Sequence, residues 1–412
     1  MTLLTLLASL FLLAPSDDSP SWPAFRGPKG DGHSEAAGLP VHWSESQNIK
    51  WKTAIHDRGW SSPVVWGAQI WLTTATENGH DMFVLCLDRE SGKVLHDLKL
   101  LHNDSPEPLG TDVNSYASPT PAIEAGRVYI HFGSYGTFCL DTANAQTLWA
   151  RRDLPCRHFR GPGSSPVLFR DFLILTMDGF DVEYLCALDK KTGKTVWKTD
   201  RSYPWGELDG DIRKAYTTPI IVETTDGLQL LSSGAKAAYS YDPVTGKEIW
   251  RVRYDGFSNA SMAVAGHGLA FINTGFGKAD LLAVKLSSKG EVAAPDIVWK
   301  CTQGVPLKPS PLLVGDLIFM ASDSGVATTI EARTGKQLWQ KRVGSKFTAS
   351  PILAEGRIYA FDEDGKAFVL KPGPEYEELA VNQLGSGLMA SPAAVGKALF
   401  VRTKTHLYRI EE

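Results

Sequence analysis

Residues 187–197 read Ala-Leu-Asp-Lys-Lys-Thr-Gly-Lys-Thr-Val-Trp, and the part from the aspartate onward recurs, with small changes, at Asp242 to Trp250 and at Glu331 to Trp339. The aspartate side chain can accept hydrogen bonds from turn amides, and the glycine can adopt a positive φ at no steric cost. The repeated stretch therefore predicts a tight reversal that leads into a strand ending in tryptophan.

Two further copies of this motif are incomplete. One keeps Gly92 but ends in His96, and the next keeps Trp149 but has Ala145 in the glycine position. We expect the terminal tryptophans to be structural and largely buried against the neighbouring repeat. They are Trp149, Trp197, Trp250 and Trp339, joined by Trp299 after an altered approach.

A second signature, two small residues followed by proline, opens an apolar run in each repeat. Pro63 and Pro392 are 329 residues apart, which makes seven steps of about 47. The copies are Ser61-Ser62-Pro63, Ala117-Ser118-Pro119, Ser164-Ser165-Pro166, Thr217-Thr218-Pro219, Pro309-Ser310-Pro311, Ala349-Ser350-Pro351 and Ala390-Ser391-Pro392, with Ala260-Ser261-Met262 as a copy that has lost its proline. Each apolar run is broken by a glycine-containing turn, which is typical of two strands joined by a hairpin.

Four short strands in each repeat of about 47 residues predict an all-β fold, an eight-bladed β-propeller with four-stranded blades. The last repeat ends at Glu412 without an outer strand. The segment Ile49 to Thr53 has the pattern of that strand, so we expect this N-terminal strand to close the ring. Ring closure removes the exposed edges of an open arrangement. We also expect the chain to be a monomer.

The N-terminal residues resemble a targeting segment. Leu3 to Leu13 is apolar except for Thr5 and Ser9, which is too short for a membrane span but fits a signal peptide of residues 1–16. We therefore expect export to the periplasm or beyond the cell, a lead segment at 17–48 and the propeller at 49–412. The first cysteine is Cys86, so a lipid anchor on an N-terminal cysteine is not expected.

The net charge and the spacing of the cysteines argue against several kinds of binding site. The formal net charge is −4, without the basic excess of a protein that binds nucleic acid through its phosphates. The five cysteines form no CxxC pair, so neither haem attachment nor a zinc ribbon is expected. Cys86 and Cys139 occupy the same strand position in two repeats, where a small buried side chain is the simplest interpretation.

The pattern Ala-x-Asp-x-x-x-Gly-Lys-x-x-Trp resembles the tryptophan-docking motif of the pyrroloquinoline quinone (PQQ) repeat propellers. The lead residues Trp22 to Gly32 are similar to those of exported PQQ-like repeat proteins, and the resemblance extends from Trp22 to Glu412. It implies an eight-bladed ring. The resemblance says little about function, because the motif maintains blade packing in catalytic and non-catalytic members alike.

The resemblance to quinoprotein dehydrogenases also implies what such an enzyme requires: PQQ, a calcium or lanthanide ion with an acidic ligand set, and in many members a disulfide between adjacent cysteines. This sequence has no adjacent cysteines and lacks the long inserts that build the cofactor pocket. We therefore expect no cofactor and no metal, and PQQ with calcium enters only under the alternative interpretation of the chain as an oxidoreductase.

Candidate ligand-binding residues come from the column three positions before each proline, which should surround one mouth of the axial channel. Mixed aromatic and cationic side chains suit a polar ligand such as a saccharide, or a peptide segment of a protein partner. Ordinary filling of the mouth is the alternative. The candidates, from this column and the loops beside it, are Trp60, Tyr116, Arg160, Arg213, Tyr216, Asn259 and Lys308.

Other polar clusters have simpler explanations. Residues 178–183 (Asp-Gly-Phe-Asp-Val-Glu) and 362–365 (Asp-Glu-Asp-Gly) carry carboxylates that suit calcium, but a hairpin turn shaped by the Asp and Gly residues is the favoured interpretation of both. The loop around His158 is positive, and Ser164 belongs to the repeated signature. No catalytic group emerges, so the sequence favours a non-enzymatic exported binding or scaffold module over a PQQ-dependent alcohol or sugar dehydrogenase.

Overall fold

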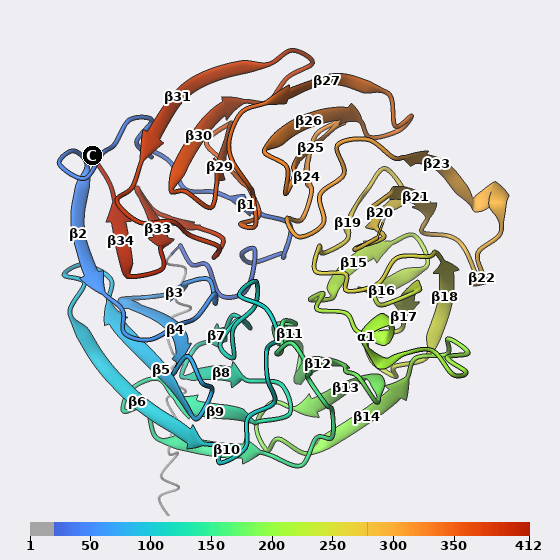
Figure 1. Ribbon diagram of the computed structural model, residues 1–412, viewed down its shortest axis with the longest axis horizontal. Helices are drawn as coiled ribbons and strands as arrows, with labels where there is room; N and C mark the ends of the chain where they lie inside the picture. Colours follow the sequence, from blue (N-terminus) through green and yellow to red (C-terminus); the bar gives the residue numbers. More distant parts are fainter. Residues whose placement is uncertain (1–19, 278) are drawn as a thin grey trace, which may run out of the picture.

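The computed structural model describes residues 20–277 and 279–412, and in this part eight sheets surround a common axis as the blades of a propeller (Figure 1). Each blade is a four-stranded antiparallel sheet in which the strands follow one another from the axis outward, except for the outermost strand of the last blade. The predicted all-β, eight-bladed architecture is confirmed.

The strands of blades 1 to 4 lie between residues 64 and 253, and the bounds follow in chain order. They are β3 (Val64–Trp66), β4 (Gln69–Ala75), β5 (Asp81–Asp88) and β6 (Val94–His102); β7 (Ala122–Glu124), β8 (Arg127–His131), β9 (Thr137–Asp141) and β10 (Thr147–Arg151); β11 (Val167–Phe169), β12 (Phe172–Asp178), β13 (Glu183–Asp189) and β14 (Thr195–Asp200); β15 (Ile220–Thr224), β16 (Gly227–Ser233), β17 (Ala237–Tyr241) and β18 (Glu248–Arg253). The short helix α1 (Gly210–Arg213) precedes blade 4.

The strands of blades 5 to 8 complete the ring. They are β19 (Val264–Gly266), β20 (Leu269–Asn273), β21 (Leu281–Lys285) and β23 (Ile297–Cys301); β24 (Leu312–Val314), β25 (Leu317–Ala321), β26 (Val326–Glu331) and β27 (Gln337–Arg342); β28 (Ile352–Ala354), β29 (Arg357–Phe361), β30 (Lys366–Lys371) and β31 (Glu377–Gln383); β32 (Ala393–Val395), β33 (Ala398–Arg402), β34 (His406–Ile410) and β2 (Ile49–Ala54). Between β21 and β23, β22 (Gly290–Glu291) adds to the outside of blade 4 in parallel with β18, and the 3₁₀ helix η1 (Ala294–Asp296) follows it.

The N-terminal strand closes the ring, as predicted. β2 pairs antiparallel with β34, and Trp51 lies opposite Arg409. The Trp51 indole Nε1 and the Arg409 guanidinium both donate to the carbonyl of Arg89 in blade 1, at 3.1 and 2.9 Å. The N-terminal strand and the C-terminal strand are therefore joined to each other within blade 8, and both contact blade 1.

The docking glycines lie against the tryptophan of the preceding blade. A Cβ on Gly193 would come within 2.7 Å of the Trp149 ring, and one on Gly246 within 2.6 Å of the Trp197 ring. Gly92 and Gly335 meet Trp51 and Trp299 in the same way. A glycine is therefore required by the neighbouring tryptophan as well as by its own positive φ, which is 72° at Gly193.

The incomplete copies agree with this packing. Blade 1 ends in His96 where blades 2 to 6 and blade 8 have tryptophan, and blade 2, which follows it, has Ala145 in the glycine position at φ 58°. Of the predicted docking tryptophans, Trp250 is fully buried, and the others are partly buried, namely Trp149, Trp197, Trp299 and Trp339. Their place between blades is confirmed, although burial is complete only at Trp250.

The small residues of the second signature form a ring of hydrogen bonds around the axis, which we call the hydroxyl ring. In each link, a backbone N–H donates to the side-chain hydroxyl of the equivalent residue in the next blade. The seven links, at 2.9–3.0 Å, run from Ser62 to Thr120, Thr120 to Ser165, Ser165 to Thr218, Met262 to Ser310, Ser310 to Ser350, Ser350 to Ser391 and Ser391 to Ser62.

The hydroxyl ring corrects the expected alignment in two blades. Blade 2 contributes Thr120, two residues after the expected Ser118, because its sequence Pro-Thr-Pro carries a second proline. Blade 5 contributes Met262, one residue after the expected Ser261. Methionine has no hydroxyl, so the link from blade 4 to blade 5 is missing.

The lead segment, of which residues 20–48 are described, crosses the axis at the end that carries the hairpins between first and second strands (Figure 1). Arg26 holds it in place: its buried guanidinium donates to the carbonyls of Asp31 and Pro311, both at 2.8 Å. Burial lowers the pKa of Arg26 to about 10. β1 (His33–Ser34) then adds to blade 7 in parallel with β28. The predicted signal peptide, residues 1–16, lies outside the described residues.

Candidate functional site

The channel mouth is formed by the residues two positions before each member of the hydroxyl ring. With the corrected alignment, blades 2 and 5 place Ser118 and Ala260 there in place of Tyr116 and Asn259. All eight residues of the corrected set are partly exposed: Trp60, Ser118, Gly163, Tyr216, Ala260, Lys308, Thr348 and Met389. Tyr116 and Asn259 are buried instead. The Tyr116 hydroxyl donates to the Glu107 carbonyl at 2.6 Å, and the Asn259 amide donates to the Asn273 carbonyl.

Three of the predicted residues come together beside blades 3 and 4. Arg160 forms a two-bonded ion pair with Asp211 of α1, at 2.8 and 3.0 Å. Arg213, at the end of the same helix, pairs in the same way with Glu183 of β13, with both bonds at 2.9 Å. The backbone of Gly163 lies against Tyr216, since a Cβ there would be 2.7 Å from the Tyr216 side chain. The ion pairs fix α1 to blade 3.

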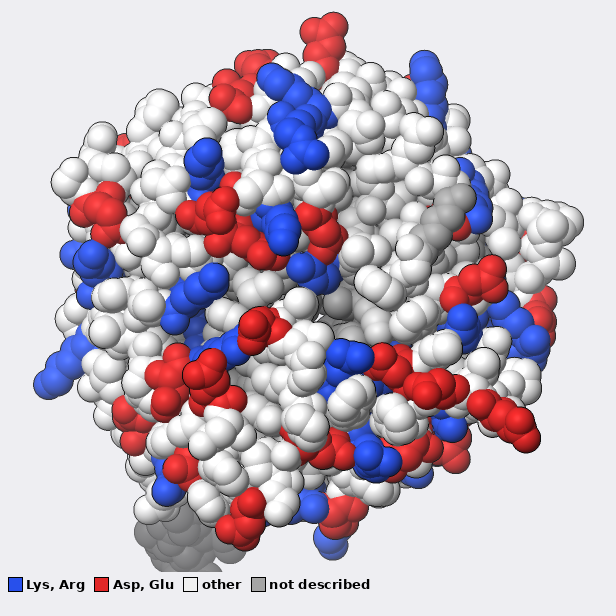
Figure 2. All heavy atoms as spheres, in the orientation of Figure 1, with Lys and Arg blue, Asp and Glu red and all other residues white. Residues whose placement is uncertain are grey.

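The other two predicted residues lie in separate groups. The Lys308 ammonium contacts Asp323 and Glu363, each at 3.2 Å, and so joins blades 6 and 7. Trp60 lies under the Arg58 guanidinium, which is 5.4 Å from the ring centroid. Figure 2 shows one face of the ring, with acidic and basic side chains interspersed around a hollow near the axis.

A buried lysine that the sequence did not indicate lies next to this group. Lys214 is fully buried, and among the described residues its Nζ has no hydrogen-bond partner; it sits 4.9 Å from the centroid of the Tyr216 ring. Burial lowers the pKa of Lys214 below its ordinary value of 10.5. Burial, together with the charge of Lys214, also holds the pKa of His158 well below its usual range. Cys156 lies 3.7 Å from the His158 ring nitrogen Nδ1.

The acidic clusters that suit calcium are engaged within the fold. Asp178 forms a buried two-bonded pair with Arg201, both bonds at 2.7 Å, and Asp181 accepts from the Arg157 amide at 2.8 Å. Asp362 accepts from the amides of its own turn. Both clusters therefore form hairpin turns. All five cysteines, which lie within the described residues, are free, and four of them are buried.

This donor set does not fit PQQ with calcium. The carboxylates nearest the mouth are bound to arginine or lysine, and the part of the chain that the structure describes contains no group of three or more His, Cys, Asp or Glu placed to hold a metal. A metal ion would have to displace an arginine or a lysine from these carboxylates, and the chain has no adjacent cysteines. The side chains at the mouth are therefore arranged for pairing with one another rather than for holding a quinone and its metal.

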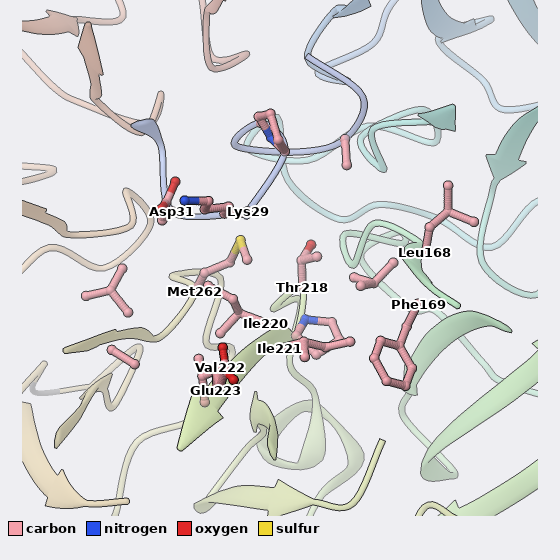
Figure 3. A pocket seen from close by; sticks show the side chains of 18 of the residues that line it. Lys29, Asp31, Leu168, Phe169, Thr218, Ile220, Ile221, Val222, Glu223 and Met262 are labelled. Carbon is pink, nitrogen blue, oxygen red and sulfur yellow. The ribbon is translucent and has the colours of Figure 1, made fainter. Parts of the chain in front are cut away.

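A large cavity lies at the opposite end of the channel, below the lead segment. Its volume is about 1160 Å³, and its walls are the inner strands of blades 3, 4 and 5. In Figure 3, Lys29 and Asp31 of the lead segment lie across the cavity from the β15 residues Ile220 to Glu223, and Leu168 and Phe169 form another wall. The predicted site residues do not line it. The lost hydroxyl at Met262, which does line it, was the available signal in the sequence.

The architecture, an eight-bladed ring with tryptophans docked between the blades, defines the class of PQQ-like repeat propellers. A family model described as outer membrane protein assembly factor BamB matches residues 43–200, 181–293 and 285–371. The chain belongs to this family.

Among the curated proteins, the chain is similar to the outer membrane protein assembly factor BamB of Shewanella oneidensis, 25% identical over 259 residues, which is 58% of this chain and 60% of the relative. It is also similar to BamB of Burkholderia pseudomallei, 33% identical over 93 residues, which is 22% of this chain and 23% of the relative. These matches span less than two thirds of the relatives' own lengths.

Solved structures share the fold at low identity. The crystal structure of BamB from Moraxella catarrhalis has a TM-score of 0.60 at 12% identity, covering 88% of this chain and 99% of that one. Quinohemoprotein alcohol dehydrogenase from Comamonas testosteroni gives 0.64 at 11% identity, covering 95% and 80%. A europium-containing methanol dehydrogenase gives 0.62 at 12%, covering 94% and 90%. An assembly factor and two dehydrogenases therefore share this ring, and the fold alone does not distinguish between these functions.

Proposed function

We propose that the chain is an exported, non-enzymatic propeller that binds a protein partner and acts as a scaffold in the assembly of other proteins. The observation that carries the proposal is the pairing at the channel mouth. Arg160 pairs with Asp211, and Arg213 pairs with Glu183, so these carboxylates are not free to bind a metal. What the mouth offers is a rigid rim of aromatic and paired charged groups, which suits recognition.

The names of the similar proteins also support a role in assembly. The curated proteins that this chain resembles are named outer membrane protein assembly factors. Assembly of an outer membrane takes place in the periplasm, which agrees with the signal peptide proposed for residues 1–16. Within the described residues, no helix is both long and apolar enough to cross a membrane.

The proposed contact surface is the channel mouth, with Trp60, Tyr216 and Lys308 as the accessible residues and Arg160 and Arg213 as their support. Trp60 and Tyr216 supply flat faces, and each long cation is already held in place by an acid. Pre-ordered side chains lower the entropy lost on binding. A saccharide would use the same groups, so the nature of the ligand is part of the test.

Cross-linking in the source cell tests this proposal. A photoreactive residue is placed at Trp60 or Lys308, and as a control at Val196, an exposed residue on the outer strand β14. We expect both mouth positions to cross-link one and the same protein, and the control to cross-link none. The proposal is contradicted if the mouth positions give no more product than Val196.

A further inference from the structure

Five of the eight inner strands already have another backbone or side chain bonded to their channel-facing edge, and that partner is the lead segment. In each case the bonded residue is the third after the member of the hydroxyl ring. Trp22 bonds both the amide and the carbonyl of Val65 (2.9 and 2.8 Å), Pro23 accepts from Ile123 (2.8 Å), His33 bonds the Leu313 carbonyl (2.7 Å), Gly32 accepts from Leu353 (2.8 Å), and Ser34 donates to Ala394 (2.8 Å).

The three remaining inner strands are neighbours, β11, β15 and β19 of blades 3, 4 and 5. Their equivalent residues are Leu168, Ile221 and Ala265. Within residues 20–277 and 279–412, none of these three forms a hydrogen bond outside its own hairpin. A strand edge of this kind accepts a further strand readily.

The hydroxyl ring is interrupted at the same place. The link from Thr218 to blade 5 is absent because Met262 has no hydroxyl, and both residues line the cavity. The amide of Thr218 therefore lacks the acceptor that its counterparts in the seven other blades have. The unpaired strand edges and the missing link coincide between blades 3 and 5.

The side chains around these edges are apolar and accessible. All three residues of β11 are partly exposed, whereas all three residues of β32, the inner strand of blade 8, are buried. Ile221 and Val222 of β15 are also partly exposed. The cavity of about 1160 Å³ exceeds the roughly 300–1,000 Å³ typical of small-molecule sites. Its rim carries both signs of charge, Lys29 with Asp31 and Glu223.

We propose that this cavity binds an extended polypeptide segment of a protein partner, and that the segment adds its backbone to the free edge of β11. The lead segment provides the intramolecular precedent, since it pairs with the same position of the inner strand in blades 1 and 7. Apolar side chains of the bound segment would contact Leu168, Phe169 and Ile221. The inference rests on the proposed function and gives it a second site, at the end of the channel opposite the mouth.

A backbone-modified peptide tests the pairing directly. The probe is a short fluorescent peptide of alternating valine and threonine, and its partner is the same peptide with alternate amides N-methylated, which removes the donors on one edge. We expect the unmodified peptide to bind the purified chain and the N-methylated one to bind at least about tenfold more weakly, or about 1.4 kcal/mol. Equal affinity of the two peptides would show a simple apolar pocket and overturn the inference.

A matched pair of variants locates the site. Leu168→Pro removes the amide donor of the free edge, which an edge strand tolerates, and Leu168→Ala keeps the donor while removing the side chain. We expect Leu168→Pro to abolish peptide binding and Leu168→Ala to weaken it less, with thermal melting confirming that both variants fold. Unchanged binding by a folded Leu168→Pro chain contradicts the inference. Cross-linking at Trp60 and Lys308 does not depend on either variant. If the peptide does not bind but the cross-links form, this inference is wrong and the proposed function is retained. If the cross-links do not form, the proposed function is wrong.

Discussion

At the scale of the residue, charge at the channel mouth is almost entirely paired, and Lys214 is the exception. Arg160, Arg213 and Lys308 each have a carboxylate partner. Lys214 is buried, and among the described residues its ammonium has no hydrogen-bond partner, although it lies 4.9 Å from the centroid of the Tyr216 ring. A buried charge without a hydrogen-bonded partner costs stability.

We predict that Lys214→Met raises the free energy of unfolding at pH 7 by about 1–4 kcal/mol, because it removes this charge. Because burial lowers the pKa of Lys214 in the folded chain, the unfolded chain binds more protons between that lowered value and 10.5. The stability of the unmodified chain should therefore rise with pH in this window, and the rise should be smaller in Lys214→Met. Thermal melts from about pH 7 up to 10.5 measure it. The exposed Lys191→Met is the control, and the same slope in both variants would contradict the account.

At the scale of the element, the hydroxyl ring ties the inner strands of adjacent blades. Ser350 accepts from the Ser310 amide at 2.9 Å, whereas the buried Ser261 hydroxyl has no partner among the described residues. These two serines are both small, both buried and both in the repeated signature. They form a matched pair for measuring one link.

We predict that Ser350→Ala lowers the free energy of unfolding by about 1–3 kcal/mol, because it leaves the Ser310 amide buried without an acceptor. Ser261→Ala should change it by less than about 0.5 kcal/mol. Equilibrium denaturation of both variants provides the comparison. If the two substitutions cost the same, the ring is a consequence of packing rather than a contributor to stability.

The elements also show what the sequence could predict. The docking motif and the signature recur at a fixed period, so the number of blades and the closing strand followed from them directly. The alignment within blades 2 and 5 did not, because Pro119-Thr120-Pro121 offers two prolines and Met262 offers none. That error assigned the buried Tyr116 and Asn259 to the mouth in place of Ser118 and Ala260.

At the scale of the whole molecule, the ring has two different ends. One end carries the mouth, where neighbouring blades are joined by ion pairs. The other end is crossed by the lead segment, which forms hydrogen bonds with the inner strands of five blades. The inner strands of the remaining three blades have an unpaired edge and line the cavity. The lost hydroxyl at Met262 marks one wall of this cavity in the sequence, but the cavity itself could not be predicted, because it depends on the path of the lead segment.

The central claim is that the chain is a binding scaffold without a quinone cofactor. It is tested most directly by titrating the purified chain with PQQ and calcium while following tryptophan fluorescence. Dye reduction with an alcohol or an aldose is assayed in the same samples. Trp60 and Trp205 lie beside Arg58 and Arg213 near the mouth, so a quinone bound there would quench them. We predict no saturable quenching and no dye reduction. Saturable quenching at micromolar PQQ, accompanied by dye reduction, would contradict the claim and identify the chain as a quinoprotein oxidoreductase.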